Sequence, residues 1–438
     1  MTKDKNLNEQ GIYDATLLGK PKMIILGLQH TFAMFGATVL VPILTGLNVS
    51  TTLLMAGLGT LLFHLLTKGK VPAFLGSSFA FLGGYAAVAP MIDGQPNTEM
   101  LPYACGGVFA AGLVYVVMAA LIKFFGAKKV MRFFPPVVTG PIIISIGLIL
   151  APTAINNCKT NWLLAIVALL TIIIFNIWGR GMAKIIPIIL GVIVSYIVAL
   201  LTHAVDLSQI SNEAILGMPP LIVAKYDLSA IITILPIALA TMMEHIGDIS
   251  AIGATTGKNY IANPGLHRTL LGDGLATCLS ALFGGPANTT YGENTGVLAL
   301  TKVYDPRVIR IAALFAVALS FIPKVSFIIS SIPAAIIGGV SLILYGMISA
   351  IGIRNVVENQ VDFTKSRNTI IAALILVCAL GFNSVGGVSF NIASTTITLS
   401  GLAIAAIVGI VANAILPGND YEFSEEEGTE EKFQTFKL

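Results

Sequence analysis

The chain has 438 residues, of which 55% are hydrophobic and only 11% are charged, and its formal net charge is +3. Soluble domains carry about 25% charged residues, so this composition indicates a membrane protein with many spans and excludes a soluble enzyme with one anchor. The cysteines show no metal-ligand or CxxC spacing. We expect all four to be buried apolar side chains without disulfide or metal partners: Cys105, Cys158, Cys278 and Cys378.

A transmembrane helix needs about 20 apolar residues, and fewer are sufficient where a helix is broken. Fourteen segments meet this requirement, and the third and tenth are the least apolar. In chain order, the predicted segments are 23–45, 50–67, 72–90, 101–122, 134–151, 161–178, 185–203, 229–251, 269–284, 286–300, 308–323, 333–352, 369–382 and 391–416.

The distribution of Lys and Arg supports this number of segments. If the N-terminus is cytoplasmic and the segments alternate in direction, all but three of the 25 Lys and Arg residues lie on the cytoplasmic side, the exceptions being Lys159, Lys225 and Lys324. Omitting one weak segment would invert every later loop and destroy this asymmetry. The positive-inside rule therefore predicts fourteen spans with both termini in the cytoplasm.

Two pairs of short motifs recur seven segments apart. PPVVTG at 135–140 opens the fifth segment, and PAAIIG at 333–338 opens the twelfth. PAFLGSS at 72–78 opens the third segment, and PANTTYG at 286–292 opens the tenth. Because seven is an odd number, the second half crosses the membrane in the opposite sense. The pattern predicts an inverted repeat, which is the architecture of many secondary transporters.

The third and tenth segments are short, begin at a proline and are polar near the middle. Interrupted hydrophobic segments at corresponding positions of two repeats indicate a binding site near the midplane of the membrane. Backbone groups outside a helix must there pair with each other or line a cavity. We therefore expect part of each segment to be extended, and the two extended stretches to meet near the midplane.

Two glutamates lie within apolar segments, Glu244 in the eighth and Glu293 in the tenth. A charged side chain at the centre of a bilayer costs about 2.5–3.5 kcal/mol even on insertion scales, so such residues commonly bind a proton or a polar substrate. Asp248 shares a helical face with Glu244, and the two could hold one proton between them. The structural alternatives are a surface-facing acid for Glu244 or Asp248, and a structural hydrogen bond for Glu293.

For the histidines and aromatic residues within the apolar segments, we favour structural roles. His245 points about 100° away from Glu244 on a helix, and His30 lies in the first segment, so both fit packing or hydrogen bonds between helices. His64 is also expected to be structural. No metal, nucleotide or nucleic-acid binding motif is present, so we expect no cofactor besides a coupling proton. Three aromatic residues offer flat surface to a planar ligand, although packing is their commoner role: Phe79, Tyr291 and Tyr345.

Several motifs resemble those of the nucleobase–ascorbate transporter family. ENTGVLALTK at 293–302 fits the family signature, an acid or glutamine followed by Asn-x-Gly, four residues, then Thr and a basic residue. The motifs at 29–42, 76–81, 244–247 and 288–294 are similar to the bacterial branch of the family that carries uracil. The resemblance extends over about residues 20–416. It implies fourteen spans in two inverted repeats, with short strands interrupting the third and tenth spans.

The resemblance also implies proton-coupled uptake of uracil across the cell membrane by a homodimer. A core domain would comprise residues 22–123 (spans 1–4) and 229–324 (spans 8–11). A gate domain would comprise residues 124–204 (spans 5–7) and 331–416 (spans 12–14). Cytoplasmic tails would lie at 1–21 and 417–438, the second of which is acidic.

Carried over by motif, Glu244 and Glu293 would bind the N–H and carbonyl edge of a pyrimidine, with the backbone of Phe79 and Gly292 completing the hydrogen bonds. The residues near the pocket would be Ala37, Ser78, Tyr291 and Tyr345. Proton coupling would involve Glu244, Asp248 and Glu293. Asp248 departs from the pattern, because the best-known member of the uracil branch has histidine there.

Glutamate at position 293 favours uracil, since xanthine and urate carriers of the family tend to have glutamine there. A purine carrier of the same family is the main alternative. An uncoupled facilitator or channel is a second alternative. An anion exchanger has less support, because anion sites favour a cation or helix N-termini over paired acids. A membrane enzyme has the least support, because no hydrolase motif is present.

Overall fold

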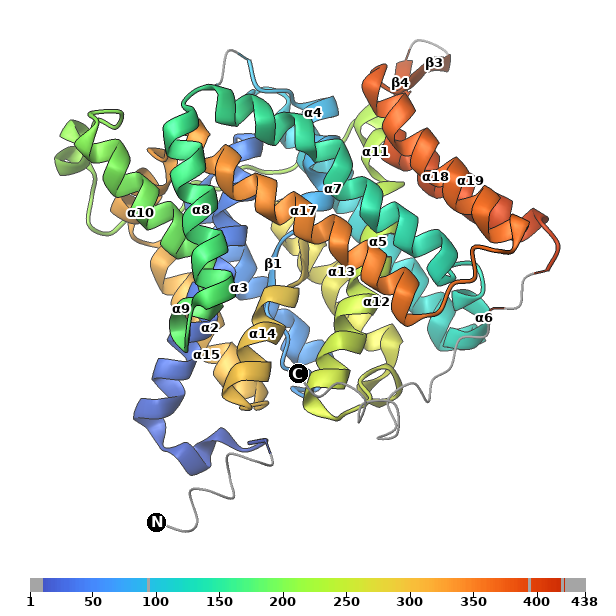
Figure 1. Cartoon of the computed structure of the whole chain (residues 1–438), viewed down its shortest axis with the longest axis horizontal. Helices are drawn as coiled ribbons and strands as arrows, with labels where there is room; N and C mark the ends of the chain where they lie inside the picture. The colour runs from blue at the N-terminus through green and yellow to red at the C-terminus, as the bar shows by residue number, and fades with distance from the viewer. Residues whose placement is uncertain (1–10, 93–94, 393–394, 419–420, 422–438) are drawn as a thin grey trace.

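The computed structural model describes residues 11–92, 95–392, 395–418 and 421, and it is mostly helical (Figure 1). The first half of the chain contains the following elements: η1 (Ala15–Leu18), α2 (Lys20–Thr45), α3 (Val49–Leu66), β1 (Leu75–Ser77), η2 (Phe79–Phe81), α4 (Leu82–Val88), α5 (Leu101–Phe125), α6 (Ala127–Met131), α7 (Pro136–Lys159), α8 (Trp162–Trp178), α9 (Met182–Ile185), α10 (Pro187–Leu201) and η3 (Ser208–Asn212).

The second half repeats this alternation of long and short helices, and it contains the other three strands of the described residues. Its elements are α11 (Leu228–Ile234), α12 (Ile237–Thr256), η4 (Ile261–Gly265), α13 (Leu266–Leu282), β2 (Asn288–Thr290), α14 (Gly292–Thr301), α15 (Pro306–Ser320), α16 (Pro323–Ser330), α17 (Ala334–Glu358), α18 (Ser366–Ser384), β3 (Val388–Ile392), β4 (Thr395–Leu399) and α19 (Gly401–Ile415).

Polar side chains and glycines define many of the helix ends. The Asn48 side chain accepts a hydrogen bond from the amide of Thr51 at the start of α3 (3.0 Å), and Asp305 accepts one from the amide of Arg307 at the start of α15 (2.9 Å). Such N-caps satisfy amides that have no partner within the helix. Gly257 ends α12 in the left-handed conformation (φ 66°), which glycine adopts without steric penalty.

Among the described residues, seven helices are long and apolar enough to cross a membrane: α2, α3, α5, α7, α11 with α12, α17 and α18. The pair α15 and α16, bent by 86°, could form an eighth span. The other apolar helices, among them α8, α10 and α19, are shorter. The protein is therefore a mostly helical, multi-pass membrane protein in which many of the predicted segments are short or broken helices.

Two segments differ from the sequence prediction. The segment expected at 391–416 begins as a hairpin of β3 and β4, and only Gly401–Ile415 is helical. The sequence TTITL at 395–399 is rich in β-branched residues, which favour strands, so the expectation of an all-helical last segment is wrong. The loop expected after residue 323 contains the short helix α16.

Helix packing repeats between the two halves of the chain. α5 packs against α13, and α15 against α3; α10 packs against α8, and α19 against α18; α8 packs against α17, and α18 against α7. In each of these three comparisons, replacing both helices of the first pair by their equivalents seven predicted segments away gives the second pair. α7 and α17 exchange with each other, and they pack together extensively. The fold therefore contains the internal repeat that the recurring motifs predict.

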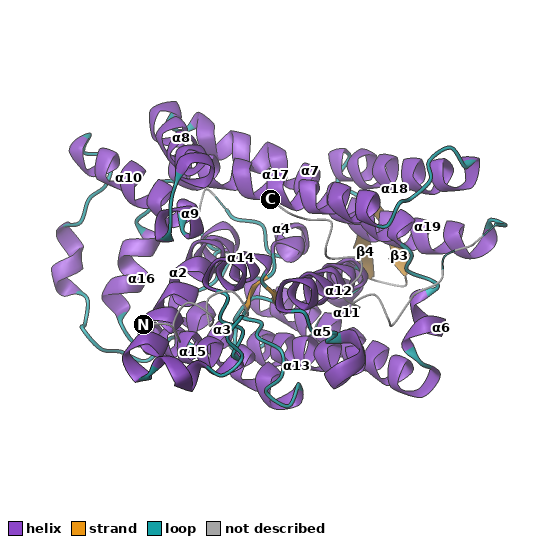
Figure 2. Cartoon of the chain, turned by 60° about the horizontal axis from the view of Figure 1, so that its bottom comes forward, coloured by secondary structure: helices purple, strands orange, loops and turns teal. Residues whose placement is uncertain are grey.

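The paired strands β1 and β2 lie in the middle of the molecule. In Figure 2, α8, α17, α7, α18 and α19 lie along one side, and α15, α3, α13 and α5 lie along the opposite side. Between these two rows lie α2, α12 and α14, together with β1 and β2. Buried apolar residues from the rows and from the centre form one continuous core. Polar groups on the strands are therefore surrounded by packed helices.

Candidate functional site

The extended stretches expected in the third and tenth segments are present, and they pair with each other. Ser78 N donates to Ala287 O and Tyr291 N donates to Phe74 O, each at 2.9 Å, so the ladder continues beyond both ends of the strands. The antiparallel pairing is consistent with two repeats that run in opposite senses. The Cα partners of β1 and β2 are Leu75 and Thr290, Gly76 and Thr289, and Ser77 and Asn288.

In each strand, a threonine hydroxyl binds the backbone groups of one outward-facing residue. Along an antiparallel pair, every second residue directs its N–H and C=O away from the partner strand. Leu75 is such a residue, and Thr60 of α3 accepts from its N (2.9 Å) and donates to its O (3.2 Å). Asn288 is its counterpart, and Thr277 of α13 accepts from its N (3.2 Å) and donates to its O (2.9 Å). Equivalent helices of the two repeats thus hold the strands.

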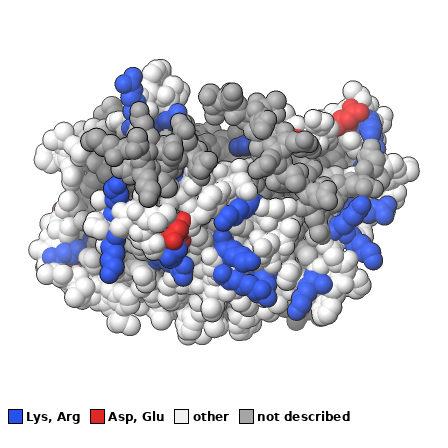
Figure 3. All heavy atoms as spheres, turned by 90° about the horizontal axis from the view of Figure 1, so that it is seen from below, with Lys and Arg blue, Asp and Glu red and all other residues white. Residues whose placement is uncertain are grey.

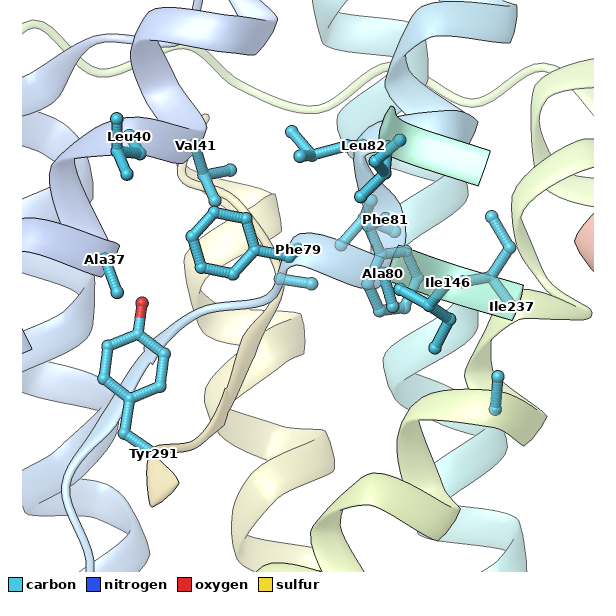
Figure 4. Packing of buried hydrophobic residues seen from close by; sticks show 14 of the residues in the cluster. Ala37, Leu40, Val41, Phe79, Ala80, Phe81, Leu82, Ile146, Ile237 and Tyr291 are labelled. Atoms are coloured by element: carbon cyan, nitrogen blue, oxygen red, sulfur yellow. The ribbon is translucent and has the colours of Figure 1, made fainter. Parts of the chain in front are cut away.

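A glycine in β1 allows an aromatic ring to lie directly on the strand. A Cβ at Gly76 would collide with the Tyr291 ring. The Tyr291 hydroxyl donates to Ser77 O at 2.9 Å, and the residue is only 3% exposed. In Figure 4 this hydroxyl points toward Ala37, which is also fully buried. Tyr291 therefore packs against β1, and its hydroxyl is already bound to backbone.

Each strand leads directly into the N-terminus of a helix. η2 begins at Phe79 and α14 begins at Gly292, and neither start has a side-chain cap. Within the described part of the chain, no group accepts a hydrogen bond from the amide of Phe79 or of Gly292. Amides at helix N-termini carry partial positive charge and bind carbonyl oxygens or anions. The two repeats thus offer one free donor each to a ligand.

Three carboxylates lie beside these amides. Glu244 and Asp248 belong to α12, which packs against α14, the helix that carries Glu293. Glu244 and Glu293 are close enough to repel each other when charged, and Asp248 is close enough to repel both. Asp248 Oδ1 also lies 3.3 Å from the point where a Cβ of Gly292 would stand. All three acids are partly exposed, as expected of groups that line an accessible space.

Tyr345 reaches the site from α17. Its ring meets the Phe79 ring edge to face, with centroids 6.2 Å apart and an interplanar angle of 75°. Within the described part of the chain, three buried hydroxyls have no partner in good hydrogen-bond geometry: those of Tyr345, of Ser341 one turn earlier in α17, and of Ser78. The hydroxyls of Tyr345 and Ser341 lie near each other. Buried polar groups without partners are rare, and each one calls for an explanation such as a functional role. Ser341 carries no sequence signal that distinguishes it from other serines in apolar helices.

A second buried polar cluster lies next to the carboxylates. His245 Nδ1 is 2.9 Å from Thr290 Oγ1 in β2 and 3.5 Å from Asp273 Oδ2 in α13. His245 and Asp273 are both fully buried. The structural role expected for His245 is confirmed, because it links α12 to β2. The sequence analysis missed Asp273, although an acid within an apolar segment carries the same signal as Glu244.

Two further histidines have the structural roles expected of them. Asn294 Nδ2 lies 3.1 Å from His30 Nδ1 and donates to His30 O, also at 3.1 Å, which joins α14 to α2. His64 Nε2 lies 2.9 Å from Ala73 O. The four cysteines are free; Cys105, Cys158 and Cys278 are buried as expected, whereas Cys378 is only partly buried.

The chain thus has a mostly helical, multi-pass fold with a cluster of polar groups at its centre. Known structures share this fold at low sequence identity. The chain is similar to the transmembrane domain of the cyanobacterial bicarbonate transporter BicA, with a TM-score of 0.61 and 16% identity over 86% of this chain and 98% of that one. It is also similar to murine Solute Carrier 26 family member A9, an anion transporter, with a TM-score of 0.64 and 11% identity over 92% of this chain and 70% of that one.

Sequence comparison defines the family more closely. The profile of the Permease family matches residues 21–388. The uracil permease of Bacillus caldolyticus is 43% identical over 410 residues, 90% of this chain and 92% of its own. The uracil permease of Bacillus subtilis (strain 168) is 41% identical over 90% of this chain and 92% of its own, and that of Escherichia coli (strain K12) is 40% identical over 88% and 89%. The chain belongs to this permease family, and it is a transporter and not an enzyme.

Proposed function

We propose that this protein imports uracil together with protons. The observation that carries the proposal is the meeting of carboxylates from α12 and α14 with the free amides of Phe79 and Gly292, beside a wall of aromatic rings. Uracil permeases of three bacteria, at 40–43% identity over most of both chains, support uracil as the substrate.

The chemistry of the site suits a neutral, planar ring with N–H donors and carbonyl acceptors on one edge. Glu244 and Glu293 accept hydrogen bonds from the ring N–H groups, and the amides of Phe79 and Gly292 donate to the ring carbonyls. The ring of Tyr345 packs against the ligand, as aromatic side chains do on planar surfaces. A ligand without matching groups leaves buried polar groups unpaired, and this penalty produces selectivity.

The grouping of Glu244, Asp248 and Glu293 supports coupling to protons. Like charges at close range repel, so a proton shared among the three acids stabilises the group. Moving an uncompensated charge through a low-dielectric passage is costly. In our proposal a proton from the outside neutralises one acid of the group, uracil binds, and both are released inside. Asp248 fits the role of proton carrier because it lies between Glu244 on its own helix and Gly292 on α14.

We further propose fourteen membrane segments divided into a core domain (22–123 and 229–324) and a gate domain (124–204 and 331–416). The row of α7, α8, α17, α18 and α19 in Figure 2 corresponds to the gate, and the opposite row with the central elements corresponds to the core. A small cavity between the two domains supports a movable boundary. Its core wall consists of Ala80, Gly83 and Ile237, and its gate wall consists of Ile146, Ile149, Leu150, Asn383, Ser400 and Leu402.

The proposed orientation places the basic end of the molecule in the cytoplasm. Lys and Arg side chains gather on the face drawn in Figure 3, where few Asp or Glu side chains are visible among the described residues. The positive-inside rule then assigns this face, and both termini, to the cytoplasm. The acidic tail at 417–438 lies almost wholly outside the described residues, and its cytoplasmic location follows from the same rule. The homodimer rests on the family resemblance alone.

Uptake of radiolabelled uracil by cells that lack their own uracil carrier tests this function. Cells that express the protein should accumulate uracil above the outside concentration, an uncoupler should abolish the accumulation, and excess unlabelled uracil should compete while excess xanthine should not. Competition by xanthine would favour a purine carrier. Equilibration without accumulation would favour an uncoupled facilitator. No uptake despite confirmed membrane expression would contradict the substrate assignment.

A further inference from the structure

The segment before the first long helix is bound to the rest of the protein. Residues 11–18, called here the N-terminal clasp, run beside the loop between α14 and α15. Ile12 N donates to Lys302 O and Tyr304 N donates to Ile12 O, both at 2.7 Å. Ile12 is buried with Val303 in a small apolar cluster. This part of the expected N-terminal tail is therefore a packed element.

Tyr13 joins the clasp to the end of α12. Its hydroxyl donates to Thr256 O at 2.5 Å, and Thr256 belongs to the last turn of the helix, where carbonyls have no helical partner. Lys258 Nζ lies 4.1 Å from the centroid of the Tyr13 ring, within the range of a cation–π interaction. The Tyr304 ring meets Tyr13 edge to face at 5.4 Å. Tyr13 thus contacts both the end of α12 and the loop after α14.

The next two residues join the clasp to the start of α15. Asp14 Oδ1 pairs with Arg307 Nη2 at 2.9 Å. Ala15 N donates to Asp305 Oδ2 at 2.7 Å, and this bond is buried because Asp305 is only 2% exposed. Asp305 is also the N-cap of α15, so one carboxylate serves both the helix and the clasp. The clasp then continues through η1 into α2.

We propose that the N-terminal clasp sets the position of α12 relative to α14, and that Tyr13 is a positioning residue for the substrate site. The identity of the substrate rests on the function proposed above. At 1.5 Å per residue, Thr256 lies about 12 Å along α12 from Asp248, and Thr301 lies about 12 Å along α14 from Glu293. A link between the ends of the two helices therefore restrains the carboxylates near their middles.

The other ends of these two helices explain why a restraint is needed here. α12 begins after a break at Leu235 and Pro236 that separates it from α11, and α14 has only ten residues and follows directly on β2. Each helix is therefore interrupted on the side away from the clasp. Binding sites require their groups to be held within about 0.5 Å of the productive geometry, so loosening the clasped ends would weaken binding before it unfolds the protein.

Two substitutions of Tyr13 separate its contacts. Tyr13→Phe removes the hydroxyl that donates to Thr256 and keeps the ring beside Lys258 and Tyr304. Tyr13→Ala removes all three contacts. Tyr103→Ala is the matched control, because Tyr103 of α5 is also a partly exposed tyrosine with a lysine over its ring (Lys225 Nζ, 5.6 Å).

Two measurements on the full-length protein test whether the clasp holds the helix ends and whether Tyr13 positions the substrate site. Uracil uptake gives KM and the maximal rate per molecule at the membrane, and hydrogen exchange of the purified protein measures the ends of the helices without any substrate. We expect Tyr13→Ala to raise KM by about three- to tenfold, the range produced by losing one or two hydrogen bonds, with a smaller rise for Tyr13→Phe. The maximal rate should change by less than about twofold, since the chemistry of the site is intact.

Hydrogen exchange should become faster in peptides that cover 250–258 and 300–305 of the Tyr13→Ala protein, and the Tyr103→Ala protein should match the wild type in both readouts. Unchanged exchange at these helix ends would overturn the clasp, whatever the substrate. Faster exchange with an unchanged KM would overturn the positioning role of Tyr13. If the wild type takes up no uracil, the proposed function fails, and hydrogen exchange still decides whether the clasp holds the helices.

Discussion

Thr60 and Thr277 bind the two halves of the central strand pair in the same way. Each hydroxyl both accepts from the N–H and donates to the C=O of one outward-facing strand residue, Leu75 for Thr60 and Asn288 for Thr277. The threonines lie in α3 and α13, helices that the internal repeat makes equivalent. The shared arrangement means that both repeats solve the same problem: a strand among buried helices needs partners for its outer backbone groups.

Replacing either threonine by valine should destabilise the protein. Thr60→Val and Thr277→Val each leave a buried N–H and C=O without a partner, at a cost of about 1–3 kcal/mol per group. The apparent unfolding temperature of the purified protein should fall, and uracil uptake should fall with it. Serine at either position keeps the hydroxyl and should preserve most of both. Thr171→Val is the control, because the Thr171 hydroxyl bonds only to a carbonyl of its own helix, Val167 O; an equal loss of stability there would contradict this account.

The two glutamates of the site should be needed for substrate binding. Glu244→Gln and Glu293→Gln each remove a charged acceptor, and hydrogen bonds to charged groups contribute about 1.5–3 kcal/mol, so uracil affinity should fall by at least about tenfold. Titration calorimetry of the purified protein measures this. Glu358→Gln is the control, since Glu358 forms an exposed pair with Arg354 in α17. Full proton-driven accumulation by Glu244→Gln would rule out the assigned role.

Asp248 should govern coupling more than binding. Asp248→Asn removes a proton-accepting group and retains a side chain of the same shape, so exchange of labelled for unlabelled uracil across proteoliposome membranes should continue. Accumulation driven by a pH gradient should be lost. Asp206→Asn, in the loop between α10 and α11, should behave as the wild type. Wild-type accumulation by Asp248→Asn would assign the coupling proton to another acid, with Glu244, Asp273 and Glu293 the groups nearest to it.

The hydroxyl of Tyr345 should contribute to substrate binding and not to stability. In the described part of the chain it is buried without a partner in good hydrogen-bond geometry, and it lies near the Ser341 hydroxyl, so Tyr345→Phe removes at most that one weak contact within the protein. The unfolding temperature should stay within error of the wild type, while KM for uracil should rise by about three- to tenfold if the ligand supplies the partner. Tyr226→Phe, at an exposed tyrosine that packs on Phe109, is the control. An unchanged KM would mean that the hydroxyl does not reach the substrate.

The pH dependence of uptake should not come from the N-terminal clasp. Hydrogen bonds from Thr16, together with the Arg307 guanidinium, lower the pKa of Asp14 from its ordinary value of 3.8. A lowered pKa means that the contribution of the Asp14 contacts is fully present above that ordinary value and is lost only as pH falls through the still lower folded value. Between about pH 5 and 8, Asp14 therefore stays charged.

Asp14→Asn should accordingly leave the pH of half-maximal uptake unchanged, even where it raises KM. Uptake measured over this pH range in wild-type and Asp14→Asn cells tests the point. A shifted pH midpoint in the variant would show that the clasp takes part in the acid stimulation that we assign to Glu244, Asp248 and Glu293.

The broken segments could be predicted because their sequences conflict with a membrane helix. PAFLGSS at 72–78 and PANTTYG at 286–292 combine a proline start with small and polar residues, and the strands lie within these motifs. The same conflict identified Glu244 and Glu293. Asp273 carries the same signal, an acid within an apolar segment, but it lies between two glycines in α13 and outside the broken segments, so no motif marks it.

Features that depend on tertiary contacts could not be predicted. The hairpin of β3 and β4 carries a local strand signal in its β-branched residues, but the hydrophobic segment predicted at 391–416 is also compatible with a helix. The N-terminal clasp lies in a polar sequence that looks like a tail, and its structure comes from partners such as Thr256 and Asp305, which are about 240 to 290 residues away in the chain. Polar sequence predicts exposure only where no distant partner exists.

Uracil accumulation by purified protein in proteoliposomes, with an acidic outside and no other energy source, tests the central claim most directly. The account predicts that labelled uracil rises inside above its outside concentration, that a protonophore collapses the gradient, and that Glu244→Gln abolishes it. Uracil that enters only to equal concentration, with the same rate with and without the pH gradient, would contradict proton-coupled uptake by this protein.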